Sequence, residues 1–179
     1  MLTYGSLLGA WRNGDKMPWD TDIDIYTDAM DNAKMNAIKD DRGFSTYSNL
    51  VHLALDVDWR IPSVSKRRRV TCDGKVLSNS YWKPDSCTFT GPLGRMIMGY
   101  EKYLDIWDVE RVNGKVFDRY GKGAYYPESE IFPLKKCSYL GLEVYCPRNP
   151  KPIFDAFYGK DKDLTNRWVC RKGRWKGSY

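Results

Sequence analysis

The sequence predicts a single α/β domain, in the broader α+β sense, with a mixed β-sheet, flanking helices and added β-hairpins. Three observations support the mixed α and β class. The 179 residues fit one domain and can bury a substantial core. Apolar residues make up 42% and aromatic residues 15% of the chain, contents that disordered chains lack. Strand-like and helix-like segments follow one another without a regular βαβ rhythm, which favours a mixed sheet.

The N-terminal part is predicted to contain a helix, a strand and a second helix. Residues 6–13 place apolar side chains at helical spacing, and residues 20–27 alternate acidic and apolar side chains with the period of a strand. Asp28 suits the N-cap of a helix that runs to about residue 39. We expect Gly43 to end that helix.

Strands are predicted to dominate the middle of the chain. On one face of a strand over 50–59, apolar side chains recur at alternate positions: Val51, Leu53, Leu55 and Val57. The basic run 66–69 is interpreted as a solvated loop, with steering of an anionic donor as the alternative. Further strands are expected at 70–76 and 103–109.

Turn residues define the C-terminal elements. Asn113-Gly114 suits the type I′ turn of a β-hairpin. A second hairpin is expected over 135–146, with its turn near Leu140-Gly141. Asn149-Pro150 begins a helix that Gly159 should end.

The composition argues against several classes of function. Lys and Arg number 29 against 23 Asp and Glu, and the resulting charge of +6 is more typical of an ordinary surface than of an anionic partner. His52 is the only histidine and is interpreted as a strand residue, which disfavours Ser-His-Asp catalysis and multi-histidine zinc sites. Five cysteines without a C-x-x-C pair leave free thiols and one or two disulfides as alternatives. No apolar run suits a transmembrane helix, and no signal-peptide layout is expected at residues 1–14.

The most informative segment is the acidic strand expected at 20–27. Alternate residues of a strand share a face, so Asp20, Asp22 and Asp24 would point the same way. Carboxylates about 7 Å apart on one half-buried face repel one another unless their pKa values rise or cations neutralise them. Oxygen ligands suit Mg²⁺ or Mn²⁺. The alternative is a solvated edge strand, but aspartate is depleted in strands. The pattern therefore indicates a divalent metal site.

A small Gly-Ser pair precedes this strand and leads into the first helix. The backbone N–H groups and the hydroxyl of Gly5-Ser6 could hold a phosphate. Phosphoryl and nucleotidyl transfer require such a cradle close to paired carboxylates. Arg12 could contact a donor phosphate, with an ordinary surface position as the alternative. Trp19, beside the acidic strand, is interpreted as a core residue, with stacking on a base as the alternative.

Two segments together resemble the signature of the LicD family. They are Tyr-Gly-Ser-Leu-Leu-Gly-Ala-Trp-Arg at 4–12 and Pro-Trp-Asp-Thr-Asp-Ile-Asp-Ile at 18–25. The family includes bacterial phosphocholine transferases, fukutin and fukutin-related protein, and fungal proteins of mannosylphosphate transfer. Residues 132–159 also follow its pattern, whereas about 60–100 match poorly. The resemblance implies one nucleotidyltransferase-fold domain over 1–179, truncated at its N-terminus because family members carry a helix and a strand before the Gly-Ser turn.

Nucleotidyltransferase folds usually need a third acidic residue from a later strand. The family has a hydrophobic-Asp-hydrophobic strand before its closing segment, and Asp105 between Leu104 and Ile106 matches it. The resemblance therefore assigns the third carboxylate to Asp105, with Asp58 as the second candidate. Asp56 and Asp58 are otherwise interpreted as strand-end residues that face solvent.

The resemblance implies a metal-dependent phosphotransferase. It would move a phosphorylated alcohol or sugar, such as phosphocholine or ribitol phosphate, from a nucleotide-activated donor, CDP-linked by expectation, to a glycan or glycoprotein. One or two Mg²⁺ or Mn²⁺ ions would serve as cofactor. The expected metal ligands are Asp20, Asp22, Asp24 and Asp105, of which the last three are catalytic, and the expected donor-binding residues are Gly5, Ser6 and Arg12.

Two other classes of function remain as alternatives. One is a non-catalytic glycan- or nucleotide-binding relative of the same fold. The other is a nucleic-acid-binding protein, suggested by the basic and aromatic tail from residue 165, but no known module organises this tail and nucleic acid is not an expected partner. A eukaryotic full-length protein of the family would work in the ER or Golgi lumen, and otherwise the expected location is the cytoplasm. Any membrane contact would come from an upstream segment.

Overall fold

The computed structural model describes residues 1–38, 40, 51–77, 83–99, 102–160 and 168–177. Its helical segments are α1 (Tyr4–Asn13), η1 (Ala29–Asp31), α2 (Asn32–Asn36), η2 (Val64–Lys66), α3 (Glu128–Ile131) and α4 (Lys151–Tyr158), of which η1 and η2 are 3₁₀ helices. Its strands are β1 (Ile23–Asp28), β2 (Val51–Leu55), β3 (Arg69–Val70), β4 (Val76–Leu77), β5 (Gly94–Met98), β6 (Lys102–Val112), β7 (Lys115–Asp118), β8 (Ala124–Pro127), β9 (Lys135–Tyr139), β10 (Leu142–Cys146), β11 (Trp168–Arg171) and β12 (Arg174–Gly177). Among the described residues, none of the helices has the length and apolar character that crossing a membrane requires.

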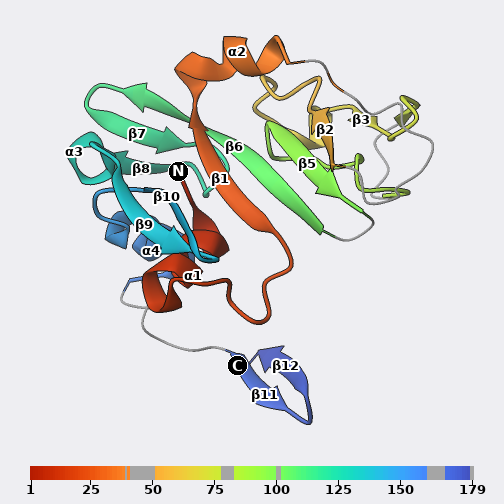
Figure 1. Ribbon diagram of the computed structural model, residues 1–179. Helices are drawn as coiled ribbons and strands as arrows, with labels where there is room; N and C mark the ends of the chain where they lie inside the picture. Colours follow the sequence, from red (N-terminus) through yellow and green to blue (C-terminus); the bar gives the residue numbers. More distant parts are fainter. Residues whose placement is uncertain (39, 41–50, 78–82, 100–101, 161–167, 178–179) are drawn as a thin grey trace.

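The long strand β6 organises a six-stranded sheet (Figure 1). Its first half lies between β1, which runs parallel to it, and β5, which runs antiparallel. β2 pairs with the other edge of β5, and β7 and β8 continue the sheet from the far end of β6. One parallel pair within an otherwise antiparallel sheet confirms the predicted mixed fold. The separate hairpin β9–β10 is the one predicted over 135–146, whereas the sequence patterns did not predict the hairpin β11–β12.

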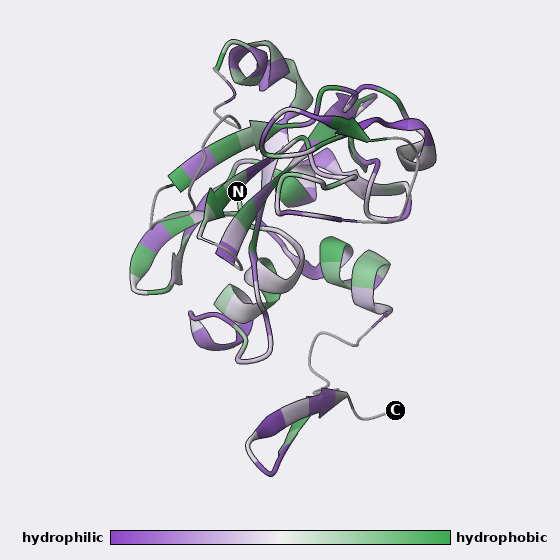
Figure 2. Ribbon diagram, turned by 90° about the vertical axis from the view of Figure 1, so that its right-hand side faces the viewer, coloured by the Kyte–Doolittle hydropathy of each residue, from purple (hydrophilic) through white to green (hydrophobic). Residues whose placement is uncertain are grey.

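The main core lies where α1, α4 and the hairpin β9–β10 pack against the sheet (Figure 1). It buries apolar side chains of these elements together with others of β1, β6, β7 and β8. A smaller cluster joins β2 and β5 to a disulfide: Ala54, Cys72, Cys87, Phe89 and Ile97. In Figure 2 the C-terminal hairpin β11–β12 lies apart from this body and is largely hydrophilic.

Two disulfides resolve the alternatives that the five cysteines left open. Cys72 is bonded to Cys87, and Cys137 is bonded to Cys146 across the hairpin β9–β10. Cys170 is an exposed thiol on β11. Each bond stabilises the folded protein, because a cross-link lowers the entropy of the unfolded chain.

The turn signals in the sequence predicted the hairpins and the last helix correctly. Asn113 and Gly114 both have positive φ, at 50° and 72°, as a type I′ turn requires. Leu140 and Gly141 repeat that geometry at 54° and 73° between β9 and β10. α4 ends where Gly159 donates its backbone N–H to the Asp155 carbonyl.

The first strand and the helix after it are shorter than predicted. β1 begins at Ile23 rather than at residue 20. Asp28 caps the next element as expected, since its carboxylate accepts from the Met30 backbone N–H at 3.0 Å. That element is a 3₁₀ turn followed by a helix that ends at Asn36, and the predicted stop at Gly43 lies outside the described residues.

Two predictions in the middle of the chain are wrong. On β2 the buried side chains are those of His52 and Ala54, whereas Val51 is 55% exposed. The buried face is the one that meets Ile97 of β5 and the Cys72–Cys87 disulfide, so neighbouring segments override the apolar alternation. The basic run 66–69 is not simply a solvated loop, because Arg67 is only 1% exposed.

Candidate metal and phosphate site

Three side chains stand in a row across neighbouring strands. Asp24 of β1 lies directly opposite Asp105 of β6, and Arg95 of β5 lies directly opposite the same Asp105. Directly opposed residues project from one face of a sheet, so these side chains meet there. Asp22, immediately before β1, joins them, and one carboxylate oxygen from each of Asp22, Asp24 and Asp105 lies within 4.8 Å of the other two.

Burial and mutual repulsion set the protonation of these carboxylates. Burial raises the pKa of Asp24 to about 7, the indole N–H of Trp107 opposes this rise, and the charges of Asp22 and Asp105 add to it. The Trp107 Nε1 donates to Asp24 Oδ1 at 2.9 Å. Burial also raises the pKa of Asp105, against the opposing effect of the Arg95 guanidinium. The cluster therefore holds negative charge that a cation would stabilise.

Asp20 lies beside this cluster but is not part of the strand. Because β1 begins at Ile23, the predicted alignment of Asp20 with Asp22 and Asp24 does not form. Its carboxylate packs over α1, where a Cβ on Gly5 would lie 2.6 Å from Asp20 Oδ2. Burial, followed by the charge of Asp22, raises the pKa of Asp20 to about 6. Its buried Oδ2 has no hydrogen-bond partner in the part of the chain that the structure describes.

Ser6 ties the first helix to the acidic strand. Its Oγ accepts the backbone N–H of Asp24 at 2.9 Å, and the residue is fully buried. This bond satisfies a buried amide and fixes where β1 starts relative to α1. The sequence also predicted that Ser6 would contact a donor phosphate. That role stays a prediction, in addition to the hydrogen bond with Asp24.

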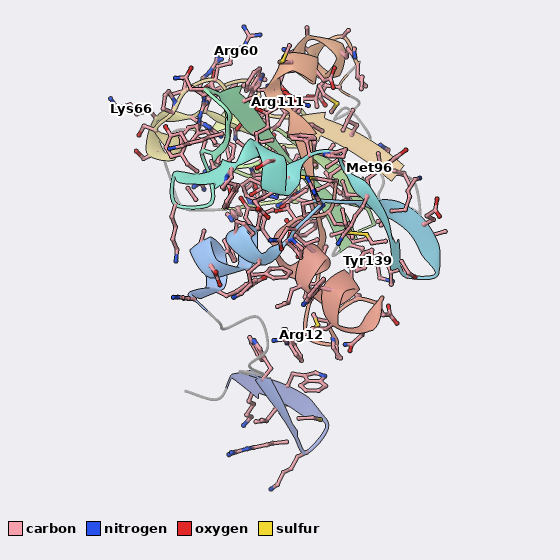
Figure 3. The ribbon with its side chains drawn as sticks, turned by 90° about the vertical axis from the view of Figure 1, so that its left-hand side faces the viewer. Arg12, Arg60, Lys66, Met96, Arg111 and Tyr139 are labelled. Carbon is pink, nitrogen blue, oxygen red and sulfur yellow. A yellow bond between two sulfur atoms is a disulfide. The ribbon has the colours of Figure 1, made fainter. Side chains whose placement is uncertain are left out.

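A cavity of about 390 Å³ opens next to the acidic cluster. Most of its lining is aromatic, and the polar or charged lining residues include Asp20, Asp24 and Arg12. Gly5 also lines it, so two of the three predicted donor-binding residues, Gly5 and Arg12, face one space. Arg12, labelled in Figure 3, lies on the side of α1 nearest the hairpin β11–β12.

Tryptophans connect the C-terminal hairpin to this cavity. Trp19 stacks on Trp168 with ring centroids 5.9 Å apart and also contacts Trp175 at 5.0 Å. Trp19 and Trp168 both line the cavity. The prediction that Trp19 packs in the core is therefore wrong: it is half-buried and forms part of the cavity wall.

A buried aspartate, Asp118, anchors the start of α1 through a hydrogen bond. Asp118 is fully buried and accepts hydrogen bonds from the hydroxyls of Tyr4, Tyr26 and Tyr126. Tyr4 has a φ of 44°, in the left-handed region that bulky residues rarely adopt. The Tyr4 ring also meets Trp107 edge-on at 5.5 Å. This network fixes the cavity wall beside the carboxylates.

The structure separates the candidates for the third carboxylate. Asp105 is in the cluster, whereas the Asp58 carboxylate accepts from the backbone and the guanidinium of Arg68 at 2.8 Å. Asp56 does not face solvent as predicted. It is 5% exposed and pairs with the buried Arg67, whose Nη1 lies 3.4 Å from Asp56 Oδ2.

Sequence reasoning missed two residues of the site, Arg95 and Trp107. Trp107 was not recognised as a partner of the acidic strand, although it lies two residues after Asp105 and so shares its face of β6. Arg95 is the one charged residue in the short strand Gly94–Met98, which the sequence patterns did not predict. A charge inside an apolar segment was the available signal.

The fold and site together define a class: a nucleotidyltransferase-type α+β domain with carboxylates gathered at a cavity. The family model described as "LicD/FKTN/FKRP, nucleotidyltransferase domain" matches residues 1–149. The chain therefore belongs to the LicD family, which is in general a family of glycan-modifying transferases of the phosphotransferase type. A search of curated proteins finds no match to the chain.

Proposed function

We propose that the protein is a metal-dependent phosphotransferase. It moves a phosphorylated alcohol or sugar from a nucleotide-activated donor to a hydroxyl of a glycan or glycoprotein. The observation that supports this most is the convergence of Asp22, Asp24 and Asp105 beside a cavity that Gly5 and Arg12 line. Carboxylates next to a donor-sized space are what transfer of a substituted phosphate requires.

The residues present fit a hard divalent cation such as Mg²⁺ or Mn²⁺. Three carboxylates offer oxygen ligands close enough to share one ion, and oxygen is the ligand these ions prefer. The raised pKa of the buried Asp24 indicates that its ionised form lacks compensating charge. The bound cation would supply charge stabilisation at the phosphoryl oxygens.

The chain's own residues would position the reactants. Asp24 is held at two points, since its N–H donates to Ser6 Oγ and its carboxylate accepts from Trp107. Such preorganisation lowers the cost of ordering the site when charge develops. Arg12 supplies positive charge for the donor phosphates, and Gly5 lines the same cavity.

The reaction exchanges one phosphorus–oxygen bond for another. The acceptor hydroxyl oxygen attacks the phosphorus next to the alcohol or sugar, and the bond from that phosphorus to the bridging oxygen breaks. The nucleoside monophosphate leaves with that bond's electron pair. A carboxylate of the site takes the proton of the attacking hydroxyl.

The two disulfides support a location in an oxidising compartment. Each disulfide, Cys72–Cys87 and Cys137–Cys146, joins two cysteines that are close to each other in the sequence. Disulfides persist in secreted and lumenal proteins and are rare in the cytosol. We therefore propose that the reaction takes place in an oxidising compartment, which is the lumen of the ER or Golgi if the protein is eukaryotic.

A screen of nucleotide-activated donors tests the proposed function. CDP-linked and related donors are incubated with a panel of glycan acceptors and Mn²⁺, and release of nucleoside monophosphate is measured. We expect Asp22→Asn to lower release at least 100-fold, on the scale of losing a major electrostatic contribution. The matched control is Asp58→Asn, which should keep activity, because the Asp58 carboxylate pairs with Arg68 outside the cluster.

Two results would contradict the proposal. Full activity of a folded Asp22→Asn protein would remove the cluster from the reaction. Binding of Mn²⁺ and of nucleotide with no turnover of any donor would instead support the non-catalytic binding relative.

A further inference from the structure

We propose that the Arg95 guanidinium acts as a permanent positive charge within the acidic cluster of Asp22, Asp24 and Asp105. It keeps the three carboxylates together in the protein without donor, and it limits the cluster to a single divalent ion. This inference rests on the proposed metal site and specifies its charge balance. It concerns a residue that does not itself bind the cation. Arg95 is therefore a positioning residue for Asp105.

The contact between Arg95 and Asp105 has the geometry of a strong ion pair. Arg95 Nε donates to Asp105 Oδ1 at 2.6 Å, and Arg95 Nη2 donates to Asp105 Oδ2 at 2.8 Å. Both oxygens of the carboxylate are thus engaged by one guanidinium, a two-point contact that fixes orientation as well as distance. The two side chains are only 14% and 6% exposed, so water screens their attraction little.

Other groups hold the guanidinium in place. It lies over the ring of Tyr103 at 3.9 Å and over the ring of Phe89 at 5.0 Å. Arg95 Nη1 also donates to the Ser86 carbonyl at 3.3 Å. Ser86 precedes Cys87, which the disulfide ties to Cys72. These contacts come from β6 and from a cross-linked loop, so the arginine is aimed at the cluster by its surroundings.

The local charges balance with one divalent ion. Asp22, Asp24 and Asp105 contribute three negative charges when ionised, and Arg95 cancels one of them. Two negative charges remain, which a single divalent cation neutralises. Nearby Asp20 and Lys83 add one charge of each sign and leave this balance unchanged.

Removal of the arginine should make the cluster more dependent on metal. In Arg95→Met the buried Asp105 loses its partner, so repulsion among the carboxylates rises in the metal-free protein. A divalent cation then stabilises the folded state more than in wild type, because it relieves more repulsion. Arg95→Lys keeps the charge and should restore much of the wild-type behaviour.

Thermal melts with EDTA and with Mn²⁺ test this inference. We expect the rise in melting temperature caused by Mn²⁺ to be at least twofold larger in Arg95→Met than in wild type. The double variant with Asp105→Asn should lose that extra rise. A Mn²⁺ titration monitored by electron paramagnetic resonance should show one bound Mn²⁺ per wild-type chain and a second bound Mn²⁺ in Arg95→Met.

Arg111 offers a matched control. Figure 3 labels this arginine, whose side chain is 40% exposed. It pairs with Asp28 at 2.8 Å and stacks over Phe132 at 4.0 Å, as Arg95 pairs with a carboxylate and stacks on rings. Arg111→Met should lower the melting temperature without changing the effect of Mn²⁺.

Several outcomes would overturn the inference. The first is an equal Mn²⁺-induced rise in melting temperature in wild type and Arg95→Met. The second is an Arg95→Lys protein that behaves like Arg95→Met. The third is the binding of two Mn²⁺ ions to wild type without donor. A wild-type protein with no Mn²⁺ shift at all would instead overturn the metal site of the proposed function, and this inference with it.

Discussion

Replacement of Asp24 by asparagine should stabilise the metal-free protein while it abolishes the proposed activity. Burial and neighbouring carboxylates raise the pKa of Asp24 from 3.8 to about 7 in the folded state. A tenfold change in proton affinity corresponds to about 1.4 kcal/mol, so the ionised carboxylate costs up to about 4 kcal/mol of folding stability above neutral pH. For a chain of this size that is roughly 8–16 °C in melting temperature.

The sign follows from proton linkage. The folded state binds the Asp24 proton more tightly than the unfolded state, so the cost is absent below about pH 4 and grows as pH rises to about 7. Asparagine carries no charge, and its amide oxygen can still accept the Trp107 N–H. The variant should therefore melt above wild type at pH 8 in EDTA and converge with it near pH 4.

Melting curves from pH 2 to pH 8 in EDTA check this prediction, with Asp58→Asn as a control of opposite sign. Hydrogen bonds from Arg68 lower the pKa of Asp58 to about 2, so its ionised form stabilises the folded state. Asp58→Asn should therefore lose stability at neutral pH, a loss that disappears as pH falls from about 4 to about 2. An Asp24→Asn protein that is no more stable than wild type at pH 8 would refute the reasoning.

Three further experiments test other parts of the site. Asp105→Ala should weaken Mn²⁺ affinity at least tenfold while Asp58→Ala leaves it unchanged, and the reverse ranking in an equilibrium titration would move the third ligand to the earlier segment. Ser6→Ala should lower the free energy of unfolding by about 1–3 kcal/mol, because the buried Asp24 N–H loses its acceptor; an unchanged urea midpoint would contradict this. Trp168→Ala removes part of the cavity wall and should raise the KM for the donor more than it lowers kcat, whereas an unchanged KM would place the hairpin outside the donor site.

Sequence patterns predicted the features that neighbouring residues determine locally. The turn at Asn113-Gly114 requires positive φ at two successive positions, and few residue pairs accept that. Gly159 ends α4 in the same local way. The spacing of Asp22 and Asp24 placed two carboxylates in one cluster, although Asp22 lies just before β1.

Other features depend on strand register and on contacts between distant segments, which the sequence does not reveal. Arg95 meets Asp105 only because β5 and β6 pair in one particular register. His52 faces inward because of what packs against β2, against the apolar alternation of its own strand. Asp20 leaves the row of aspartates because the chain turns before Ile23 and its carboxylate packs over Gly5.

The most direct test of the central claim is a Mn²⁺ titration of wild type and of the triple variant Asp22→Asn, Asp24→Asn, Asp105→Asn, monitored by electron paramagnetic resonance. The three carboxylates converge within 4.8 Å, so they should bind the cation as one site. We predict saturable binding of one ion to wild type and the loss of that binding in the folded triple variant. Equal binding by the two proteins would place the metal elsewhere and contradict the account.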